Sequence, residues 1–298
     1  MPPQPPPFIS VVIPTYNHAA LLGDAIESLK AQDYPPDRYE IVVSDDGSTD
    51  NTASVAEAAQ RDAQVRLLYE RRRHGGVNAA RNAGIEAASG EIICLLDADE
   101  MAPPGWLSVI EEQFRSDAGL VSFVGGPYRA FGRPRFRTCR DHATIGAYEA
   151  EGELPLALGG NMAMHRRVLD AVGHFDPSLS GLGDETEWQR RALSAGFSLS
   201  IVPTMWVYHR RDLQSPRELF SRRFKQARGG VMYGLRTRGD SVNESLFALL
   251  LAAGRCLGHL ATKRCFTGWI GVADALGRLG GRLAYRVSDF AHRHGNAA

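Results

Sequence analysis

Two aspartates, Asp97 and Asp99, stand directly after the apolar run Glu91–Leu96. In an extended chain, side chains two residues apart point to the same side. Two neighbouring carboxylates are costly to bury unless a cation compensates them. A divalent cation such as Mg²⁺ takes one or two carboxylates together with substrate phosphates. The pair therefore predicts a metal site; a D-x-D sequence in a solvated turn is the alternative that these residues alone leave open.

A second acidic segment, Ser44–Asp50 with the sequence SDDGSTD, also follows an apolar run. Asp50 or Ser48 can cap the helix that we expect to start near Thr52, because short oxygen-bearing side chains bind the free amides of a first helical turn. Capping does not account for Asp45, the first residue beyond the strand. Asp45 is a candidate for accepting hydrogen bonds from a base or a sugar.

The segment Gly75–Gly84, GGVNAARNAG, combines small residues with one arginine, Arg81. Small side chains let a helix approach a neighbouring element closely, and the planar guanidinium can bind phosphate oxygens. A packing helix with a surface arginine is an equally good interpretation.

Two common nucleotide-binding motifs do not occur where they would be expected. No G-x-G-x-x-G follows the first apolar run and no G-x-x-x-x-G-K-[ST] occurs in the sequence, which argues against a dinucleotide oxidoreductase and a P-loop NTPase.

Three further candidates lie in the second half of the sequence. Asp184 and Glu185 stand at the start of a predicted helix, where a negative charge is favourable for the helix dipole. A carboxylate there could also act as a base beside a reacting hydroxyl. His209 ends the run Met205–Tyr208; a lone histidine is more often structural than a metal ligand.

The elements that must position these residues alternate in hydrophobic period, which predicts a βαβαβ order and a mostly parallel sheet with helices on both faces. The predicted strands are Phe8–Ile13, Glu40–Ser44, Val65–Tyr69, Glu91–Leu96 and Leu120–Val124. Helical spacing occurs in Leu21–Leu29, Thr52–Ala63 and Asn78–Ala88, and a further helix is expected from Pro103–Pro104 through Phe114. Ligands of such sheets bind at the carboxyl ends of the strands, where the polar residues lie.

The later part of the sequence is less regular. The arginine-rich stretch Tyr128–Glu153 is expected to be an irregular loop. A helix from Asp184 to Ala195 and strands near Leu199 and Trp206 complete the first unit. Beyond Arg211 the pattern changes to basic helices, as in Pro216–Arg228 and Ser245–Leu260.

In their order and spacing these motifs resemble the family 2 glycosyltransferases, which have a GT-A fold: an α/β fold with a Rossmann-like, mostly parallel central sheet flanked by helices. The matching segments are Ile13–Asn17, Asp45–Asp50, Ala80–Gly84, Leu96–Asp99, Gly160–Ala163, Gly183–Glu185 and Tyr208–His209. The series is specific to the fold and the reaction class, and it carries little information about the sugar.

The resemblance implies a role for each matching position. Asp45 would bind the nucleotide base, Thr15 and Arg81 would contact the nucleotide and its diphosphate, and Asp99 with His209 would hold Mg²⁺ or Mn²⁺. Asp97 would support the ribose or a metal-bound water. The complete nucleotide-sugar set is Pro14, Thr15, Tyr16, Asn17, Asp45, Asp46, Arg81, Asp97, Ala98, Gly160 and Asn161.

The base position departs from the family pattern. The family usually has Glu-Asp, with Asp as the base, whereas this chain has Asp184-Glu185. When the chain is aligned to the family pattern without a gap, Glu185 is the base, and its side chain is one methylene longer than the usual Asp. An alignment shifted by one residue gives the role to Asp184. In either case one displacement at the anomeric carbon inverts its configuration.

Two other functions fit the sequence less well. A processive polysaccharide synthase would carry a Gln-x-x-Arg-Trp motif and spanning helices, but the look-alike at Phe220, Arg223 and Phe224 lacks both Gln and Trp, and no run of 18 apolar residues occurs. A non-catalytic sugar-nucleotide-binding or scaffold protein of the same fold is the alternative, against which the carboxylates at the metal and base positions argue.

Charge divides the sequence of 298 residues in two. The formal net charge is zero. Up to His209 the chain has 18 Lys and Arg against 28 Asp and Glu, and from Arg210 it has 16 against 6. The zero total excludes a strongly basic nucleic-acid binder. The basic part predicts contact with a membrane surface; a helix packed on the catalytic domain, or a homodimer contact, is the alternative.

These observations give the expected organisation: a disordered leader over residues 1–7, a catalytic domain over 8–210 and a basic helical extension over 211–298. Within the catalytic domain, residues 8–100 would bind the nucleotide and 101–210 the acceptor. Four scattered cysteines indicate a reducing compartment. We expect a cytoplasmic protein, peripheral on the inner face of the membrane, that takes a UDP- or GDP-sugar donor and a glycan or lipid-linked acceptor.

Overall fold

The structure of the protein is a computed structural model that describes residues 6–116, 121–130, 144–145, 157, 159–179, 184–210, 220–221, 224 and 276–281. The chain divides into two compact units. The first comprises Met1–Gly132, Ala143–Ser178 and Glu185–Arg211, and the second Arg133–His142, Leu179–Asp184 and Asp212–Ala298.

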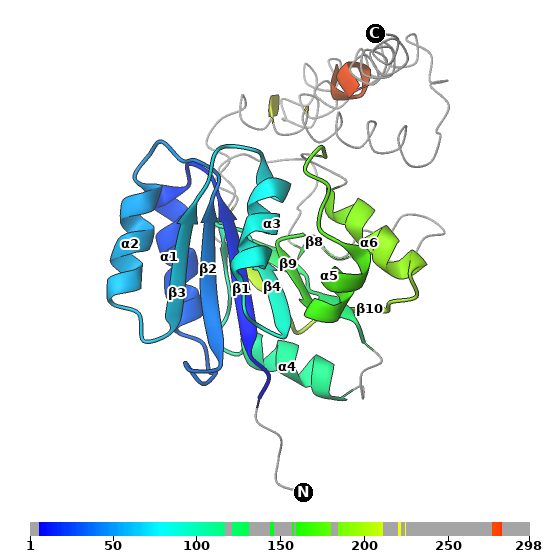
Figure 1. Cartoon of the computed structure of the whole chain (residues 1–298), viewed down its shortest axis with the longest axis horizontal. Coiled ribbons are helices and arrows are strands. Elements are labelled where there is room, and N and C mark those ends of the chain that lie inside the picture. The colour runs from blue at the N-terminus through cyan, green and yellow to red at the C-terminus, as the bar shows by residue number, and fades with distance from the viewer. Residues whose placement is uncertain are drawn as a thin grey trace, which may run out of the picture. The chain divides into compact units, whose positions relative to one another are not determined.

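A seven-stranded sheet forms the centre of the first unit, with strand order β10-β6-β9-β4-β1-β2-β3 (Figure 1). The strands are β1 Ile9–Thr15, β2 Tyr39–Asp45, β3 Arg66–Arg71, β4 Ile92–Leu96, β6 Phe123–Gly125, β9 Asn161–His165 and β10 Leu199–Ile201. All neighbouring pairs are parallel except the two that β9 makes. The expected α/β class with a mostly parallel sheet is confirmed.

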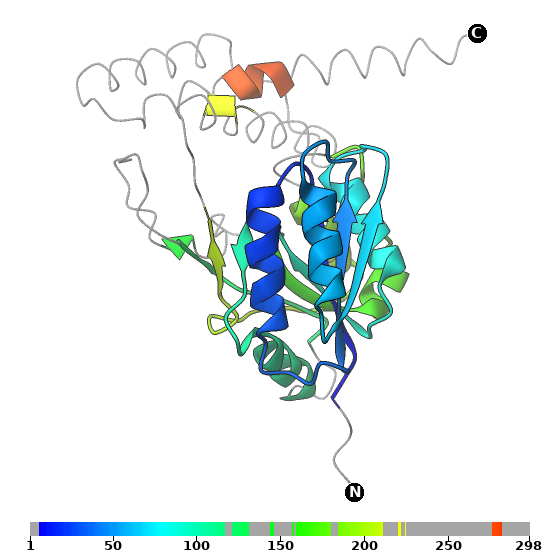
Figure 2. The ribbon, with the colours of Figure 1, turned by 90° about the vertical axis from the view of Figure 1, so that its left-hand side faces the viewer.

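Helices cover both faces of this sheet. They are α1 Ala19–Lys30, α2 Thr52–Arg61, α3 Val77–Ala87, α4 Trp106–Ser116, α5 Arg166–Val172 and α6 Asp184–Ser194. One core packs α1, α2 and α4 against alternate residues of β1 such as Ile9 and Val11. The other packs α3, α5 and α6 against residues of opposite parity such as Val12. Figure 2 shows α1 and α2 side by side on their face. Because both faces are covered, the strands are continuous apolar runs.

Strand register brings the polar residues to one edge. β1 lies between β2 and β4, so the chain reverses its direction of winding at β1. Thr15 is paired with Asp45, and Asp45 with Arg71 on β3. In doubly wound sheets the crevice at such a reversal, outside the carboxyl ends of the strands, is where ligands bind.

A second sheet of four short strands, in the order β5-β11-β7-β8, adjoins this edge. Its strands are β5 Glu100–Met101, β7 Tyr128–Ala130, β8 Thr144–Ile145 and β11 Val207–His209. The expectation of an irregular loop over Tyr128–Glu153 is therefore wrong for β7 and β8. These strands are too short to show an alternating pattern, and their pairing with β11 and with each other is a non-local contact.

Much of the basic extension lies outside the described residues, including the predicted helix Ser245–Leu260 and most of Pro216–Arg228. Positions 276–281 are helical, and a Cβ placed on Gly280 would lie 3.3 Å from Cζ of Phe224 in the same unit. Within the described part of the chain, we find no helix long and apolar enough to cross a membrane.

Close packing of α3 on the sheet depends on Gly84. A Cβ added there would lie 2.4 Å from Cγ1 of Val12 and 3.2 Å from Cβ of Ser44. We expect Gly84→Ala to lower the free energy of unfolding by about 1–3 kcal/mol, measured by chemical denaturation, because overpacking outweighs the gain in helix propensity. Gly105→Ala is the matched control, since nothing lies within 4 Å of its added Cβ. Equal stability of both variants and the parent would contradict this packing argument.

Candidate active site

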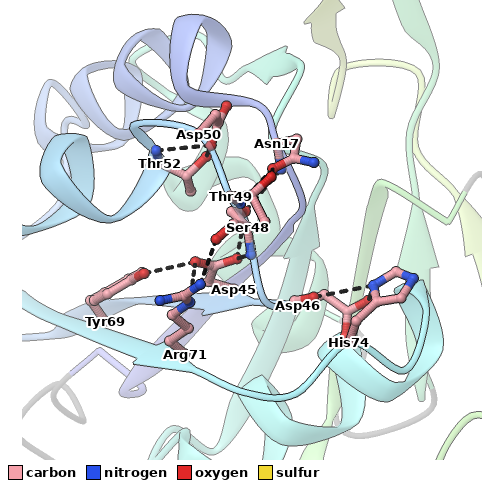
Figure 3. Close-up of polar contacts among 10 residues, drawn as sticks. All are labelled: Asn17, Asp45, Asp46, Ser48, Thr49, Asp50, Thr52, Tyr69, Arg71 and His74. Carbon is pink, nitrogen blue, oxygen red and sulfur yellow. Dashed lines mark hydrogen bonds and ion pairs between the residues drawn. The ribbon is translucent and has the colours of Figure 1, made fainter.

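The carboxylate of Asp45, at the end of β2, is held by several polar contacts. Its Oδ1 accepts hydrogen bonds from the Ser48 amide at 2.8 Å and the Ser48 hydroxyl at 2.6 Å. Its Oδ2 accepts the Tyr69 hydroxyl at 2.7 Å and lies 4.0 Å from Nε of Arg71 (Figure 3). The side chain is fully buried. Asp45 therefore lies at the expected position, covered by Tyr69 and Arg71 at the end of β3.

Asp46, the next residue, makes its contacts with the loop that precedes α3. Its Oδ1 accepts the Gly75 amide at 2.9 Å, and its Oδ2 accepts the Gly76 amide at 2.8 Å and lies 2.8 Å from Nδ1 of His74. Arg72 adds an ion pair at 3.3 Å. The carboxylate thus binds the backbone that leads into α3, and it holds this loop against the end of β2.

The β1–α1 and β2–α2 loops are bound to each other by side chains. Asn17 has a left-handed backbone, with φ of 54°. Its backbone N–H donates to the Ser48 hydroxyl, and its side-chain Oδ1 accepts the backbone amide of Thr49 at 2.8 Å. Oδ1 of Asp50 accepts the amide of Thr52, the first residue of α2, and Oδ2 accepts the Ala19 amide. The N-cap residue is Asn51, whose side chain makes no cap hydrogen bond, so Asp50 binds the start of the helix from the position before the N-cap.

Thr15 and Tyr16, at the end of β1, differ in their exposure. Tyr16 is 42% exposed and stacks on His74, with ring centroids 4.5 Å apart. Thr15 is buried at the end of β1, and its Oγ1 has no hydrogen-bond partner among the described residues. Pro14, the preceding residue, is buried in β1 opposite Ser44.

Arg81 is buried on α3, so the interpretation as a surface arginine is wrong. It is 5% exposed, and its Nη1 donates to Oδ1 of Asn78 at 3.2 Å. Nη2 lies 3.4 Å from Oδ1 of Asp97, and the guanidinium lies over the Phe175 ring at 5.9 Å from the centroid. Arg81 thus joins the end of β4 to α3.

The D-x-D motif continues into a third acidic residue, Glu100, the first residue of β5. Oε2 of Glu100 accepts the Asp97 amide at 3.2 Å. Oδ2 of Asp99 lies 3.5 Å from Nε2 of His209. Burial, and then the charges of Asp97 and Asp99, raise the pKa of the Glu100 carboxyl well above its ordinary value. One ligand atom from each of Asp99, Glu100 and His209 lies within 4.8 Å of the others.

A divalent cation fits this cluster on two observations. Oε1 of Glu100 is buried and has no hydrogen-bond partner among the described residues. Carboxylate oxygens and an imidazole nitrogen are suitable ligands for Mg²⁺ or Mn²⁺, and a cation would offset the neighbouring charges of Asp97 and Asp99. The predicted ligands Asp99 and His209 are thus brought together.

Two glycines, Gly159 and Gly160, form the wall between the metal cluster and α6. A Cβ on Gly160 would lie 2.6 Å from Oδ2 of Asp97 and 2.7 Å from Oε1 of Glu100. A Cβ on Gly159 would lie 3.3 Å from both Cδ of Glu185 and Nη2 of Arg81. Without side chains at these positions, the carboxylates of Asp97 and Glu185 and the Arg81 guanidinium converge on one small space.

Two residues of the predicted nucleotide-sugar set, Asn161 and Ala98, are buried. Asn161 is fully buried: its Nδ2 donates to the Met205 carbonyl at 2.7 Å, and its Oδ1 accepts Nε1 of Trp106 at 3.0 Å. Ala98 packs in the core beneath the motif. Asp184 begins α6, and its side chain lies outside the part that the structure describes.

Sequence reasoning missed Glu100, Tyr69, Arg71 and His74. Glu100 directly follows the D-x-D pair, so its acidity was a usable signal. Tyr69 and Arg71 lie at the carboxyl end of a strand whose apolar pattern had already faded, and their roles come from pairing with β2. Nothing in the sequence predicted that His74 would stack on Tyr16.

The model of the family described as Glycosyl transferase family 2 matches residues 10–173, which is more than half of the chain. The chain belongs to glycosyl transferase family 2. Glycosyltransferase AglE of Haloferax volcanii is 29% identical over 300 residues, covering 94% of this chain and 96% of that protein. A GalNAc(5)-diNAcBac-PP-undecaprenol beta-1,3-glucosyltransferase of Campylobacter jejuni is 37% identical over 108 residues, 36% of this chain and 34% of that protein.

Solved structures show the fold of this family 2 glycosyltransferase. Mannosyltransferase PcManGT from Pyrobaculum calidifontis, in complex with GDP-Man and Mn²⁺, has a TM-score of 0.65 at 19% identity, over 96% of this chain and 88% of that one. S. aureus TarS in complex with UDP-GlcNAc has a TM-score of 0.56 at 18% identity, over 97% and 92%. The expected GT-A fold and the glycosyltransferase class are confirmed.

Proposed function

We propose that this glycosyltransferase moves a hexosyl group from a nucleoside diphosphate sugar to an acceptor hydroxyl, with inversion and with a divalent metal ion. The observation that carries the proposal is that Asp97, Glu100 and Glu185 meet around Gly159–Gly160, with Asp99 and His209 beside Glu100. This arrangement supports a metal site and a base on either side of one space.

The residues would divide the work as follows. Thr15, Tyr16 and Asp45 bind the nucleoside at the ends of β1 and β2, where Tyr16 offers an exposed ring. Asp99 and His209 hold Mg²⁺ or Mn²⁺, which supplies positive charge to the departing diphosphate. Glu185 removes the proton from the acceptor hydroxyl while that oxygen attacks the anomeric carbon from the face opposite the leaving group. Arg81 lies beside Asp97 and positions it.

The donor and acceptor classes are drawn from the relatives. One structural neighbour is complexed with GDP-Man and Mn²⁺ and another with UDP-GlcNAc, which supports a GDP- or UDP-sugar donor. A relative named for a PP-undecaprenol substrate supports a lipid-linked acceptor. Such an acceptor would suit a peripheral enzyme on the inner face of the cytoplasmic membrane.

The first prediction concerns the metal. We expect slow donor hydrolysis, assayed across UDP- and GDP-sugars, to require Mn²⁺ or Mg²⁺ and to stop when EDTA is added. Asp99→Ala should remove this activity and leave the thermal unfolding of the protein cooperative. A non-catalytic binding protein of the same fold would hydrolyse no donor in any of these conditions, and that result would overturn the proposal.

The second prediction identifies the base. Glu185→Gln should lower kcat about 10²–10⁴-fold, because the amide cannot take the acceptor proton. Asp184→Asn, the neighbouring variant at the first residue of α6, should retain most of the activity. Steady-state kinetics with donor and acceptor measure both. The reverse pattern would assign the role of base to Asp184. If both variants keep their activity, neither residue is the base.

The basic extension, residues 211–298, is proposed to bind anionic lipid. Its excess of Lys and Arg, set against the excess of Asp and Glu in residues 1–209, supports this proposal. Electrostatic attraction of basic segments to anionic headgroups weakens as salt is added.

A flotation experiment checks the lipid contact. The full-length protein should float with phosphatidylglycerol-containing liposomes at low salt and less at high salt. Liposomes of phosphatidylcholine alone are the control, and the protein should stay with the dense fraction in their presence. Protein that stays in the dense fraction with both liposome types at low salt would refute the membrane contact.

A further inference from the structure

We propose that Glu100 is a third protein ligand of the divalent cation, beside Asp99 and His209. This inference rests on the metal dependence proposed above and adds a residue that lies outside the D-x-D motif. It begins from the second sheet, where β5 and β11 are antiparallel and Glu100 is paired with His209. Directly opposite residues of an antiparallel pair point to the same face of the sheet. Both side chains are buried on that face.

The two oxygens of the Glu100 carboxyl have different surroundings. Oε2 is held by the Asp97 amide at 3.2 Å, which fixes the orientation of the group. Oε1 is buried and lacks a hydrogen-bond partner among the described residues. A buried carboxylate oxygen without a partner is costly, and a cation is the partner that the adjacent Asp99 and His209 would share with it.

The distances suit one small ion. Ligand atoms of the three residues lie within 4.8 Å of one another, and Oδ2 of Asp99 is 3.5 Å from Nε2 of His209. Opposite ligands of an octahedral Mg²⁺ lie about 4.2 Å apart and adjacent ones about 3 Å. Small side-chain rotations therefore bring all three atoms onto one ion, and the remaining positions stay available for water and diphosphate oxygens.

Charge balance also favours the ligand role over a purely structural one. Asp97 has the Arg81 guanidinium at 3.4 Å. Glu100 instead has two aspartates near it, and its neutral neighbour is Tyr128, whose hydroxyl interacts with the Glu100 carboxyl and accepts the Gly160 amide at 3.1 Å. A divalent cation offsets three neighbouring carboxyl groups far better than hydrogen bonds to neutral donors do.

The test measures binding of Mn²⁺ alone to the full-length protein, by the loss of the free Mn²⁺ signal in electron paramagnetic resonance. Glu100→Gln keeps the shape of the side chain and the acceptor for the Asp97 amide, and it removes the charge. We expect it to weaken Mn²⁺ binding about tenfold or more. Asp99→Asn is the positive control, with a comparable loss.

Glu40→Gln is the matched control for removing a buried carboxylate. Glu40 is fully buried near the amino-terminal end of β2 in the seven-stranded sheet, away from the metal cluster, and is bound to Ser10, Ser89 and Arg66. It should bind Mn²⁺ like the parent even if it unfolds at a lower temperature. If Glu40→Gln weakens Mn²⁺ binding as much as Glu100→Gln does, the effect is general destabilisation of the protein, and the inference is overturned.

The remaining outcomes separate this inference from the proposed function. Parent-like Mn²⁺ affinity in Glu100→Gln, with a loss in Asp99→Asn, overturns the role of Glu100 and leaves the metal site intact. An absence of Mn²⁺ binding by the parent counts against the metal dependence itself. If Glu100→Gln does not fold, Glu100→Asp retracts the carboxylate by one methylene, and parent-like affinity in that variant also overturns the proposal.

Discussion

Burial of carboxylates at one edge of the sheet is the constraint on which the site depends. Asp45, Asp46 and Glu100 are each almost completely buried, and a buried charge must be compensated by hydrogen bonds, an opposite charge or a metal. Each is compensated differently. Asp45 has Ser48 and Tyr69, Asp46 has the amides before α3, and Glu100 has the Asp97 amide and one unpartnered oxygen.

These compensations also build the surrounding loops. Asp46, which follows β2, accepts a hydrogen bond from the segment that leads to α3. Asn17 accepts one from Thr49 and so joins the β1–α1 loop to the β2–α2 loop. Loops at the carboxyl edge of a parallel sheet carry the ligand contacts, and rigid support lets them hold a fixed geometry. The same residues that look like a nucleotide motif therefore include two, Asp46 and Asn17, whose hydrogen bonds shape the site.

The glycines act through the space that they leave. Gly84 lets α3 approach β1, and Gly160 lets β9 approach the carboxylates of Asp97 and Glu100. Because α3 carries Arg81 and β9 lies beside β4, both close approaches bring charged groups toward one point. The position of Glu185 at the start of α6 completes that convergence from the other side of Gly159.

The sequence by itself determined the α/β class, the order of strands and helices in the first half, and the grouping of Asp45, Asp97 and Asp99 at strand ends. Those properties follow from local periodicity and from the rule that parallel strands end together. Tertiary structure alone decided that Glu100 faces His209 across β5 and β11, that Arg81 is buried against Asp97, and that Asn161 binds Trp106 and Met205. The first of these contacts lies on strands of two and three residues, which are too short for a periodic pattern to predict. The other two depend on which side chains meet when separate elements pack, and local periodicity carries no information about that.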